Sequence, residues 1–296
     1  MTRARPTNVA ASVRARLLTL ARKRGDRFQD VLVRYGTERL LYRLSQSTHR
    51  DQFLLKGAVL FAAWVGVPHR ATRDADLLGV GDASPANAPR VFRDVTRLPS
   101  EPDDGLIFDA GSIRAEDIRE ESTSGGVRVT LRASLDGALI PLQVDLAFGE
   151  AVVPPAEPVE LPSLLDFPPI RLRGYPPEVT IAEKFEAMVK LGMANSRMKD
   201  YYDIWYLATH RQFDAPRLAR AVAATFGRRG TAVPETVPDG LSDGFASDSQ
   251  REHMWQAFLE RAGIPSPERT SLASTTRVIR AFLMNVAATA ASTARA

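Results

Sequence analysis

Two aspartates, Asp74 and Asp76, stand two residues apart in a polar segment that begins at Arg70. If this segment is a strand, both carboxylates project to the same side, because side chains alternate along a strand. Two carboxylates at one end of a sheet suit a pair of Mg²⁺ ions, which bridge triphosphate oxygens and stabilise the attacking and leaving oxygens of a phosphoryl transfer. A charged strand edge without metal fits the same spacing, so the pair alone leaves both interpretations open.

A glycine turn precedes this pair. Lys56, Gly57 and Ala58 lie between an apolar stretch over residues 53–55 and a second apolar run. Glycine allows backbone N–H groups to approach a phosphate closely, and the start of a helix favours negative charge. Turns of this kind are most often structural, but Asp74 follows about 17 residues after Gly57, and this spacing favours a nucleotide-binding function.

A third carboxylate, Asp145, lies in a strongly apolar segment. Residues 139–148 alternate so that the apolar side chains share one face, which puts Asp145 on the opposite face with Gln143. If that face lines the same cleft as Asp74 and Asp76, Asp145 completes a metal site with three carboxylates. If that face is only solvated, Asp145 is an ordinary polar residue at the surface, and the sequence does not choose between the two.

One lysine and two aspartates in predicted helices form the last motif. Lys184 borders an apolar helical stripe, and an unpaired lysine is costly to bury, so we expect it to be paired or functional. It can bind a triphosphate as a point charge. Asp200 and Asp203 share a helix face, so a salt-bridge network from Lys184 to either aspartate is the structural alternative. The stripe consists of Ile181, Phe185 and Met188.

The choice of basic residues supports these motifs. Of the 39 basic residues only five are lysine, and three of these, at positions 56, 184 and 199, fall inside the motifs. Lysine offers a compact point charge that the planar guanidinium of arginine does not reproduce. The formal net charge of +4 is compatible with a polyanionic partner such as RNA.

Composition excludes several other chemistries. The absence of cysteine excludes disulfides, thiolate metal sites and cysteine nucleophiles. The four histidines show no metal-ligand spacing, and the sequence shows no recognisable pattern of a Ser/His/Asp triad. The start of the chain has no apolar signal core, and the longest apolar run, residues 58–67, is too short to cross a bilayer. We therefore expect a cytoplasmic protein without a membrane partner.

The elements that must position these residues follow from hydrophobic periodicity and from turn residues. The pattern predicts an α/β (α+β) fold with a mixed sheet, divided into an N-terminal helical cap (1–50), a core (51–165) and a helical C-terminal domain (166–296). The proline-rich stretch 152–177 is expected to be a linker with one strand at 170–172, and residues 228–248 a long loop. Helices are predicted at 8–24, 28–46, 57–65, 85–98, 178–193, 198–209, 214–226, 250–262 and 269–290, and strands at 53–55, 75–78, 106–108, 127–133 and 139–148.

The order of the motifs resembles a known family. Lys-Gly-Ala, Arg-x-Thr-x-Asp-x-Asp-Leu, a later Val-Asp strand, Glu-Lys and Lys-Asp-x-x-Asp follow one another from about residue 53 to 207. This order is similar to that of the AbiEii/AbiGii toxins, nucleotidyltransferase-like toxins of type IV toxin–antitoxin systems that include the MenT-type toxins. No single motif is specific, but five in the correct order are. The sequence departs from the family at Ala58-Val59, where many members have Gly or Ser followed by Thr.

The resemblance implies a nucleotidyltransferase core of the DNA polymerase β type with an added helical domain. It implies that Asp74 and Asp76 bind Mg²⁺, with Mn²⁺ as an alternative and Asp145 as a weaker third match. Lys184 falls on the family's catalytic or triphosphate-binding lysine, and Asp200 or Asp203 on its late essential acid. The nucleotide-binding residues are then expected to be Lys56, Gly57, Ala58, Arg70, Thr72 and Lys184.

The resemblance also implies a function. We expect a toxin, acting as a monomer, that moves a nucleoside monophosphate from an NTP, here a pyrimidine nucleotide, to the 3′ end of tRNA and so blocks translation. The expected partners are the NTP, tRNA or another RNA acceptor, and a cognate antitoxin. The alternatives are nucleotidylation of a protein hydroxyl, a GTP-binding regulatory toxin without RNA transfer, and a structural or interaction protein.

Overall fold

The computed structural model describes residues 8–65, 72, 74–81, 83–118, 126–149, 151–265 and 269–295. The chain forms two compact units, each with its own core. Unit 1 comprises Met1–Gly66, Ala71–Glu150 and Pro158–Gly174, and unit 2 comprises Val67–Arg70, Ala151–Glu157 and Tyr175–Ala296.

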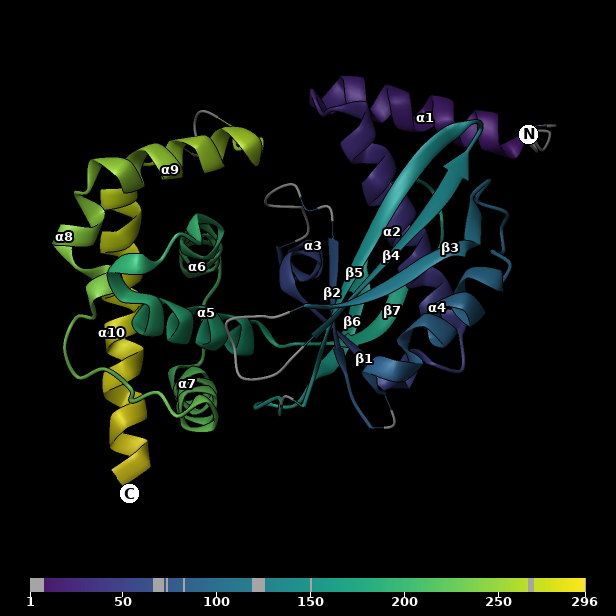
Figure 1. The fold of residues 1–296 in the computed structure, drawn as a ribbon. Helices are drawn as coiled ribbons and strands as arrows, with labels where there is room; N and C mark the ends of the chain where they lie inside the picture. Colours follow the sequence, from purple (N-terminus) through teal and green to yellow (C-terminus); the bar gives the residue numbers. More distant parts are fainter. Residues whose placement is uncertain are drawn as a thin grey trace. The chain divides into compact units, whose positions relative to one another are not determined.

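Unit 1 is built on a seven-stranded mixed sheet with the strand order β3-β4-β5-β2-β1-β7-β6 (Figure 1). The strands β3, β4 and β5 are antiparallel, β5 is parallel to β2, β2 is antiparallel to β1, and β1 is parallel to β7. The strands are β1 (Phe53–Lys56), β2 (Asp74–Gly79), β3 (Ile107–Ile118), β4 (Gly126–Leu135), β5 (Ala138–Phe148), β6 (Glu157–Leu161) and β7 (Ile170–Gly174). The helices of this unit are α1 (Val9–Arg24), α2 (Phe28–Gln46), α3 (Phe61–Val65) and α4 (Ala88–Arg97).

Helices α2 and α4 cover one face of this sheet. α2 contacts β5 and β7, and α4 contacts β3 and β4. Gly36 lets α2 approach closely, because a Cβ atom there would press on the side chains of Leu142 and Ile140. These two side chains are buried, as are Val144 and Leu146 on the same face of β5. The opposite face of the sheet is therefore the one that carries polar side chains.

A two-residue turn joins β4 to β5. Asp136 (φ 46°) and Gly137 (φ 77°) both adopt positive φ values. Two such residues in succession make the type I′ turn, whose twist matches that of the flanking strands. The turn pairs Leu135 with Ala138 and so sets the register of the whole hairpin.

Unit 2 is a helical domain. Its helices are α5 (Pro177–Leu191), α6 (Met198–His210), α7 (Ala215–Arg229), α8 (Asp243–Ala246), α9 (Ser249–Arg261) and α10 (Leu272–Arg295). α5 packs on α7, and α10 packs on α6 and α7. Tyr202 and Trp255 are fully buried in the core of this unit, and the indole N–H of Trp255 donates to the Thr270 carbonyl at 2.7 Å. None of the helices in the described part of the chain combines the length and apolar character needed to cross a membrane.

The helix ends follow local sequence rules. The Asn8 side chain accepts from the Ala11 amide at 2.9 Å and begins α1, and Asp214 caps α7 in the same way. An N-cap of this type satisfies a backbone N–H that the helix itself leaves without a partner. Gly25 (φ 72°) and Gly230 (φ 64°) end these two helices in the left-handed conformation that glycine adopts without strain.

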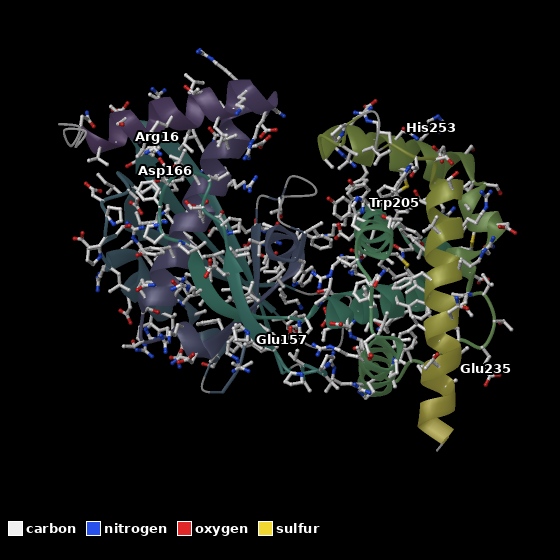
Figure 2. All side chains as sticks on the ribbon, turned by 180° about the vertical axis from the view of Figure 1, so that it is seen from behind. Arg16, Glu157, Asp166, Trp205, Glu235 and His253 are labelled. Carbon is white, nitrogen blue, oxygen red and sulfur yellow. The ribbon has the colours of Figure 1, made fainter. Side chains whose placement is uncertain are left out.

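In each unit, ion pairs join segments that are distant in sequence. In unit 1 the Arg16 guanidinium of α1 lies 2.8 Å from the carboxylate of Asp166, and Figure 2 shows the two side chains together. In unit 2 Arg217 pairs with Glu157 and lies 3.3 Å from Glu178. Such exposed pairs contribute about 0–1 kcal/mol, so they orient these segments more than they stabilise them.

The α/β fold class predicted from the sequence is confirmed, but four elements differ from the prediction. The helix expected from Gly57 begins as the 3₁₀ turn Gly57–Leu60 and is α-helical only over α3. The strand expected at 106–108 continues to Ile118, past a register shift between Asp109 and Arg114 that breaks its pattern. The linker contains a second strand, β6, whose Pro158 is tolerated because β6 lies at the sheet edge. The loop at 228–248 contains α8.

Candidate active site

Strand pairing places three of the predicted residues side by side. Asp74 and Asp76 are the first and third residues of β2, so their side chains share a face. β5 runs parallel to β2 with Asp145 directly opposite Asp76. One carboxylate oxygen from each of these three aspartates lies within 4.8 Å of the others. All three residues are half-buried.

This spacing has an electrostatic consequence. Two like charges about 4 Å apart near a protein surface repel each other by about 4 kcal/mol at an effective dielectric constant of about 20. Three carboxylates this close favour a cation, and divalent ions such as Mg²⁺ prefer oxygen ligands of this kind. The arrangement can therefore hold one or two divalent ions at the start of β2.

Asp145 is held by an arginine that the sequence reasoning missed. Arg128 of β4 donates from Nε to Oδ1 and from Nη2 to Oδ2 of Asp145, both at 2.9 Å. The Gln143 side chain donates to the same oxygens at 3.1 and 3.3 Å. The hydrogen bonds to Asp145 raise the pKa of Arg128 above its usual value. The register of the hairpin is the feature that indicates this contact, because the turn at Asp136 and Gly137 places Arg128 opposite Asp145.

Asp74 receives a hydrogen bond from its own segment. The Thr72 hydroxyl donates to Oδ1 of Asp74 at 2.8 Å. Thr72, predicted to bind nucleotide, is thus placed beside a predicted metal ligand. Arg70, predicted to bind nucleotide as well, lies outside the described residues.

The glycine turn packs directly against the second aspartate. Lys56 pairs with Asp76 in the antiparallel ladder between β1 and β2. Gly57 follows with φ 73°, and a Cβ atom at that position would overlap the Asp76 carboxylate. Only glycine satisfies both the positive φ and this close approach. Ala58 lies in the 3₁₀ turn that follows, so the structure brings the whole motif next to Asp76.

The remaining predicted residues form a second cluster, in unit 2. The Lys184 ammonium of α5 lies 2.9 Å from Oδ2 of Asp203 and is also paired with Asp200, both from α6. Lys184 retains 14% exposure of its side chain, whereas Asp200 and Asp203 retain 6% and 1%. The salt-bridge network considered as the structural alternative is therefore present. It joins α5 to α6 and fixes the position of the lysine ammonium.

Comparison with known proteins supplies the family. No curated protein matches the chain. A candidate nucleotidyltransferase from Helicobacter pylori shares 14% identity with a TM-score of 0.49, over 90% of this chain and 97% of that one. The Helicobacter pylori protein JHP933 shares 13% identity with a TM-score of 0.49, over 89% of this chain and 95% of that one.

The family model described as "Nucleotidyl transferase AbiEii toxin, Type IV TA system" matches residues 39–278. The matched stretch contains the three carboxylates of unit 1 and the lysine cluster of unit 2. The family predicted from the order of the motifs is thereby confirmed. The chain belongs to the AbiEii family of nucleotidyltransferase toxins of type IV toxin–antitoxin systems.

Proposed function

We propose that this nucleotidyltransferase transfers a nucleoside monophosphate from an NTP, preferably a pyrimidine nucleotide, to the 3′ hydroxyl of tRNA. The observation that carries the proposal is the set of three carboxylates, Asp74, Asp76 and Asp145, within 4.8 Å of one another on adjacent strands. Membership of the family implies an NTP substrate and an antitoxin partner. The RNA acceptor, the pyrimidine and the metal are parts of the proposal.

The carboxylates fit a divalent metal because one oxygen from each of the three lies within 4.8 Å of the others, and hard divalent cations prefer oxygen ligands. Bound Mg²⁺, or Mn²⁺ as the alternative, would neutralise charge on the triphosphate and polarise the bond to the leaving pyrophosphate. Asp74 and Asp76 would be its main ligands. Asp145 accepts four hydrogen bonds from Arg128 and Gln143, so it would join them as a third ligand only by releasing one of these donors, of which the Gln143 contact at 3.3 Å is the longest.

The other residues of the chain would bind and orient the substrates. Gly57 lets backbone N–H groups approach the triphosphate, and Lys56 adds a positive charge beside Asp76. By resemblance to the family, Lys184 of unit 2 is predicted to bind triphosphate, and Asp200 and Asp203 fix its ammonium group. In the reaction the acceptor oxygen bonds to the α-phosphorus as the bond to the β-phosphate oxygen breaks. The hydroxyl proton leaves to solvent.

A labelling experiment tests this function. Each of the four NTPs, labelled at the α-phosphate, is incubated with total tRNA, Mg²⁺ and either the wild-type chain or Asp76→Asn. We expect label in tRNA with wild type, strongest with a pyrimidine nucleotide, and none with Asp76→Asn. Asp117→Asn, an exposed aspartate of β3 in the same sheet, is the matched control and is expected to label like wild type.

Three outcomes would contradict the proposal. Label in a protein instead of tRNA would identify a protein hydroxyl as the acceptor. Binding of GTP without any transfer would indicate a regulatory toxin. Equal labelling by wild type and Asp76→Asn would place the chemistry outside the three carboxylates.

A further inference from the structure

A cavity of about 690 Å³ adjoins the carboxylates within unit 1. β2 pairs with β5 only from Gln143 to Phe148, whereas β5 begins at Ala138, so the first residues of β5 extend beyond the start of β2. The start of α2 lies over this extension, where the Gln29 amide donates to the Leu139 carbonyl at 3.4 Å. Asp74, the first residue of β2, forms part of the cavity wall.

The lining is that of a site for a small organic group. Val33, Leu131 and Leu142 contribute apolar wall, and Gln29 and Thr130 contribute hydrogen-bonding groups. Cavities of about 300–1,000 Å³ with mostly apolar walls and a few polar groups are typical of ligand sites. A nucleobase with its ribose has this chemistry, because its faces are apolar and its edges carry donors and acceptors.

Two arginines extend the lining towards a phosphate group. Arg27 at the start of α2 and Arg132 on β4 both line the cavity. Arg132 retains 63% exposure of its side chain, and its ion pair with Asp109 is long, at 3.5 Å. An exposed pair of this kind contributes about 0–1 kcal/mol, so a phosphate can replace Asp109 at little cost. Guanidinium groups bind phosphate oxygens well because they donate two parallel hydrogen bonds.

The geometry of the displacement determines whether the cavity binds the donor or the acceptor nucleotide. In an in-line displacement the attacking and leaving oxygens lie on opposite sides of the phosphorus. Lys56 and Gly57, which we assign to the triphosphate, lie on the β1 side of Asp76. The cavity lies on the other side of β2, over β5 and β4. The attacking hydroxyl therefore has to come from the cavity side.

We propose that this cavity binds the 3′-terminal nucleoside of a single-stranded RNA acceptor. The base occupies the cavity against the apolar wall to which Val33, Leu131 and Leu142 contribute, and the phosphate that precedes it pairs with Arg132 and Arg27. This places the terminal 3′ hydroxyl at Asp74. The assignment rests on the proposed function, because it takes the triphosphate to lie at Gly57.

Binding without chemistry tests this site. A short single-stranded RNA with a 5′ fluorophore and a free 3′ hydroxyl is titrated with protein in EDTA without NTP, and its anisotropy is measured. Thr130→Trp fills the cavity from β4, and Arg132→Glu reverses the charge at its rim. We expect each to weaken RNA binding by about tenfold, since the first variant takes the place of the base and the second repels the phosphate that precedes it. Binding by the wild type is expected to weaken as salt is added.

Matched controls separate the cavity from the rest of the sheet. Ser134→Trp adds the same bulk on β4, and Arg171→Glu reverses an exposed charge on β7, both outside the lining. Both are expected to bind RNA like wild type. Binding of a fluorescent NTP with Mg²⁺ is measured for every variant, and its retention by Thr130→Trp shows that this variant is folded.

The outcomes separate this inference from the proposed function. Wild-type RNA affinity in both Thr130→Trp and Arg132→Glu overturns the cavity as the acceptor site, even if tRNA is labelled. If these variants lose NTP binding but keep RNA binding, the cavity belongs to the donor nucleotide. This outcome also overturns the cavity as the acceptor site. If both variants lose RNA binding but the wild type labels no RNA, the acceptor site stands and the transfer reaction fails. If the wild type binds no RNA and labels a protein, both fail.

Discussion

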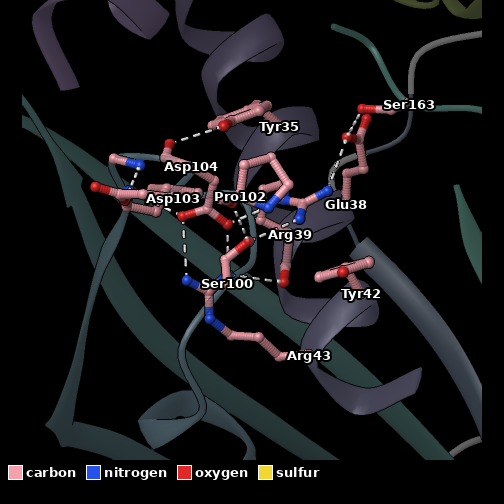
Figure 3. Close-up of polar contacts among 12 residues, drawn as sticks. Tyr35, Glu38, Arg39, Tyr42, Arg43, Ser100, Pro102, Asp103, Asp104 and Ser163 are labelled. Atoms are coloured by element: carbon pink, nitrogen blue, oxygen red, sulfur yellow. Dashed lines mark hydrogen bonds and ion pairs between the residues drawn. The ribbon is translucent and has the colours of Figure 1, made fainter. Parts of the chain in front are cut away.

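Unit 1 contains two clusters of charged side chains that differ in balance and exposure. In the first, Asp104 lies between Arg39 and Arg43 of α2, and all three are almost completely buried (Figure 3). Arg39 Nε donates to Asp104 at 3.0 Å, and Arg43 donates to it at 2.6 and 3.1 Å. The Tyr35 hydroxyl donates to the Asp104 backbone carbonyl at 2.8 Å. In the second cluster three half-buried carboxylates lie together; among the described residues Arg128 is bonded to one of them, Asp145, and Lys56 stands opposite Asp76 in the ladder.

The difference shows how the same residue types serve structure or binding. Burial alone would raise the pKa of Asp104, but the hydrogen bonds and charges of Arg43 and Arg39 outweigh it and hold that pKa below its usual value. This carboxylate is satisfied by the protein itself and has no need of a ligand. Among the described residues, the carboxylates around Asp76 outnumber the cations beside them and keep partial access to solvent, which are the conditions for binding a cation.

The largest effect is expected from removing one charge of the cluster of Asp74, Asp76 and Asp145, called the open cluster below. Asp76→Asn should lower nucleotidyl transfer by about a thousandfold, which corresponds to about 4 kcal/mol of transition-state stabilisation. Its free energy of unfolding should stay the same or rise by up to about 1 kcal/mol, because repulsion between carboxylates is relieved. Transfer assays and urea unfolding check the two parts. A large loss of stability would show that the three carboxylates support the fold.

Removal of the carboxylate from the buried cluster of Asp104, Arg39 and Arg43 is expected to lower stability. Asp104→Ala leaves two buried guanidinium groups without their carboxylate and should lower the free energy of unfolding by about 3–5 kcal/mol. Urea unfolding measures this loss. Asp94→Ala, which removes an exposed carboxylate next to His49, is the control and should cost about 0–1 kcal/mol. Equal losses in the two variants would contradict the structural role of Asp104.

Gly57 tests the contact between the turn and Asp76. Gly57→Ala should cost about 1–2 kcal/mol of stability for its positive φ, and it should also weaken Mn²⁺ binding by about tenfold because the added methyl displaces the Asp76 carboxylate. Gly25→Ala is a matched control, with φ 72° and no atom within 4 Å of the added Cβ. It should lose similar stability without any change in Mn²⁺ affinity. Equal Mn²⁺ affinities in the two variants would remove the role assigned to Gly57.

Arg128 tests the balance of charge in the open cluster. Arg128→Met removes the positive charge that faces Asp145, so Mg²⁺ should saturate the enzyme at a severalfold lower concentration. The rate at saturating Mg²⁺ should fall by about tenfold, because Asp145 loses the group that orients it. A titration of transfer rate against Mg²⁺ separates the two effects. A rise in the Mg²⁺ requirement would contradict the assigned role, and Arg171→Met on β7 should change neither quantity.

The smallest effect concerns acid stability. Because folding lowers the pKa of Asp104, this carboxylate contributes stability above its usual pKa of 3.8, and the contribution is lost as pH falls through the lowered value. Asp104→Asn should therefore be less stable than wild type at neutral pH, and the two unfolding free energies should converge as the pH falls below about 3.8. Urea unfolding at a series of pH values measures this, and parallel curves would contradict it.

Local patterns predicted much of this molecule. The alternation over residues 139–148 placed Asp145 on the face opposite the apolar core, and the structure has it there. The apolar stripe beside Lys184 predicted that this lysine is paired or functional, and the structure shows it paired with both aspartates. The order of the motifs predicted the family. In each case the signal lies within one element or in the order of elements along the chain.

The features that the sequence did not predict depend on distant pairing. Arg128 reaches Asp145 only through the register of the hairpin. Asp104 lies in a segment whose Pro and Gly indicate a turn, and its partners on α2 precede it by more than 60 residues. The cavity beside Asp74 exists because β5 is longer than β2. The catalytic, nucleotide-binding and metal-binding roles of the named residues, and the tRNA acceptor, remain predictions for the experiments above.

The two-residue turn between β4 and β5 limits which insertions and deletions the protein tolerates. One additional residue between Leu135 and Ala138 would slip the ladder by one position and turn every side chain of one strand to the opposite face. Arg128 would then point into the core and Asp145 would lose its partner, although neither codon had changed. We therefore expect functional homologues to keep this turn free of single-residue insertions and deletions, while the edge strands β3 and β6 vary in length.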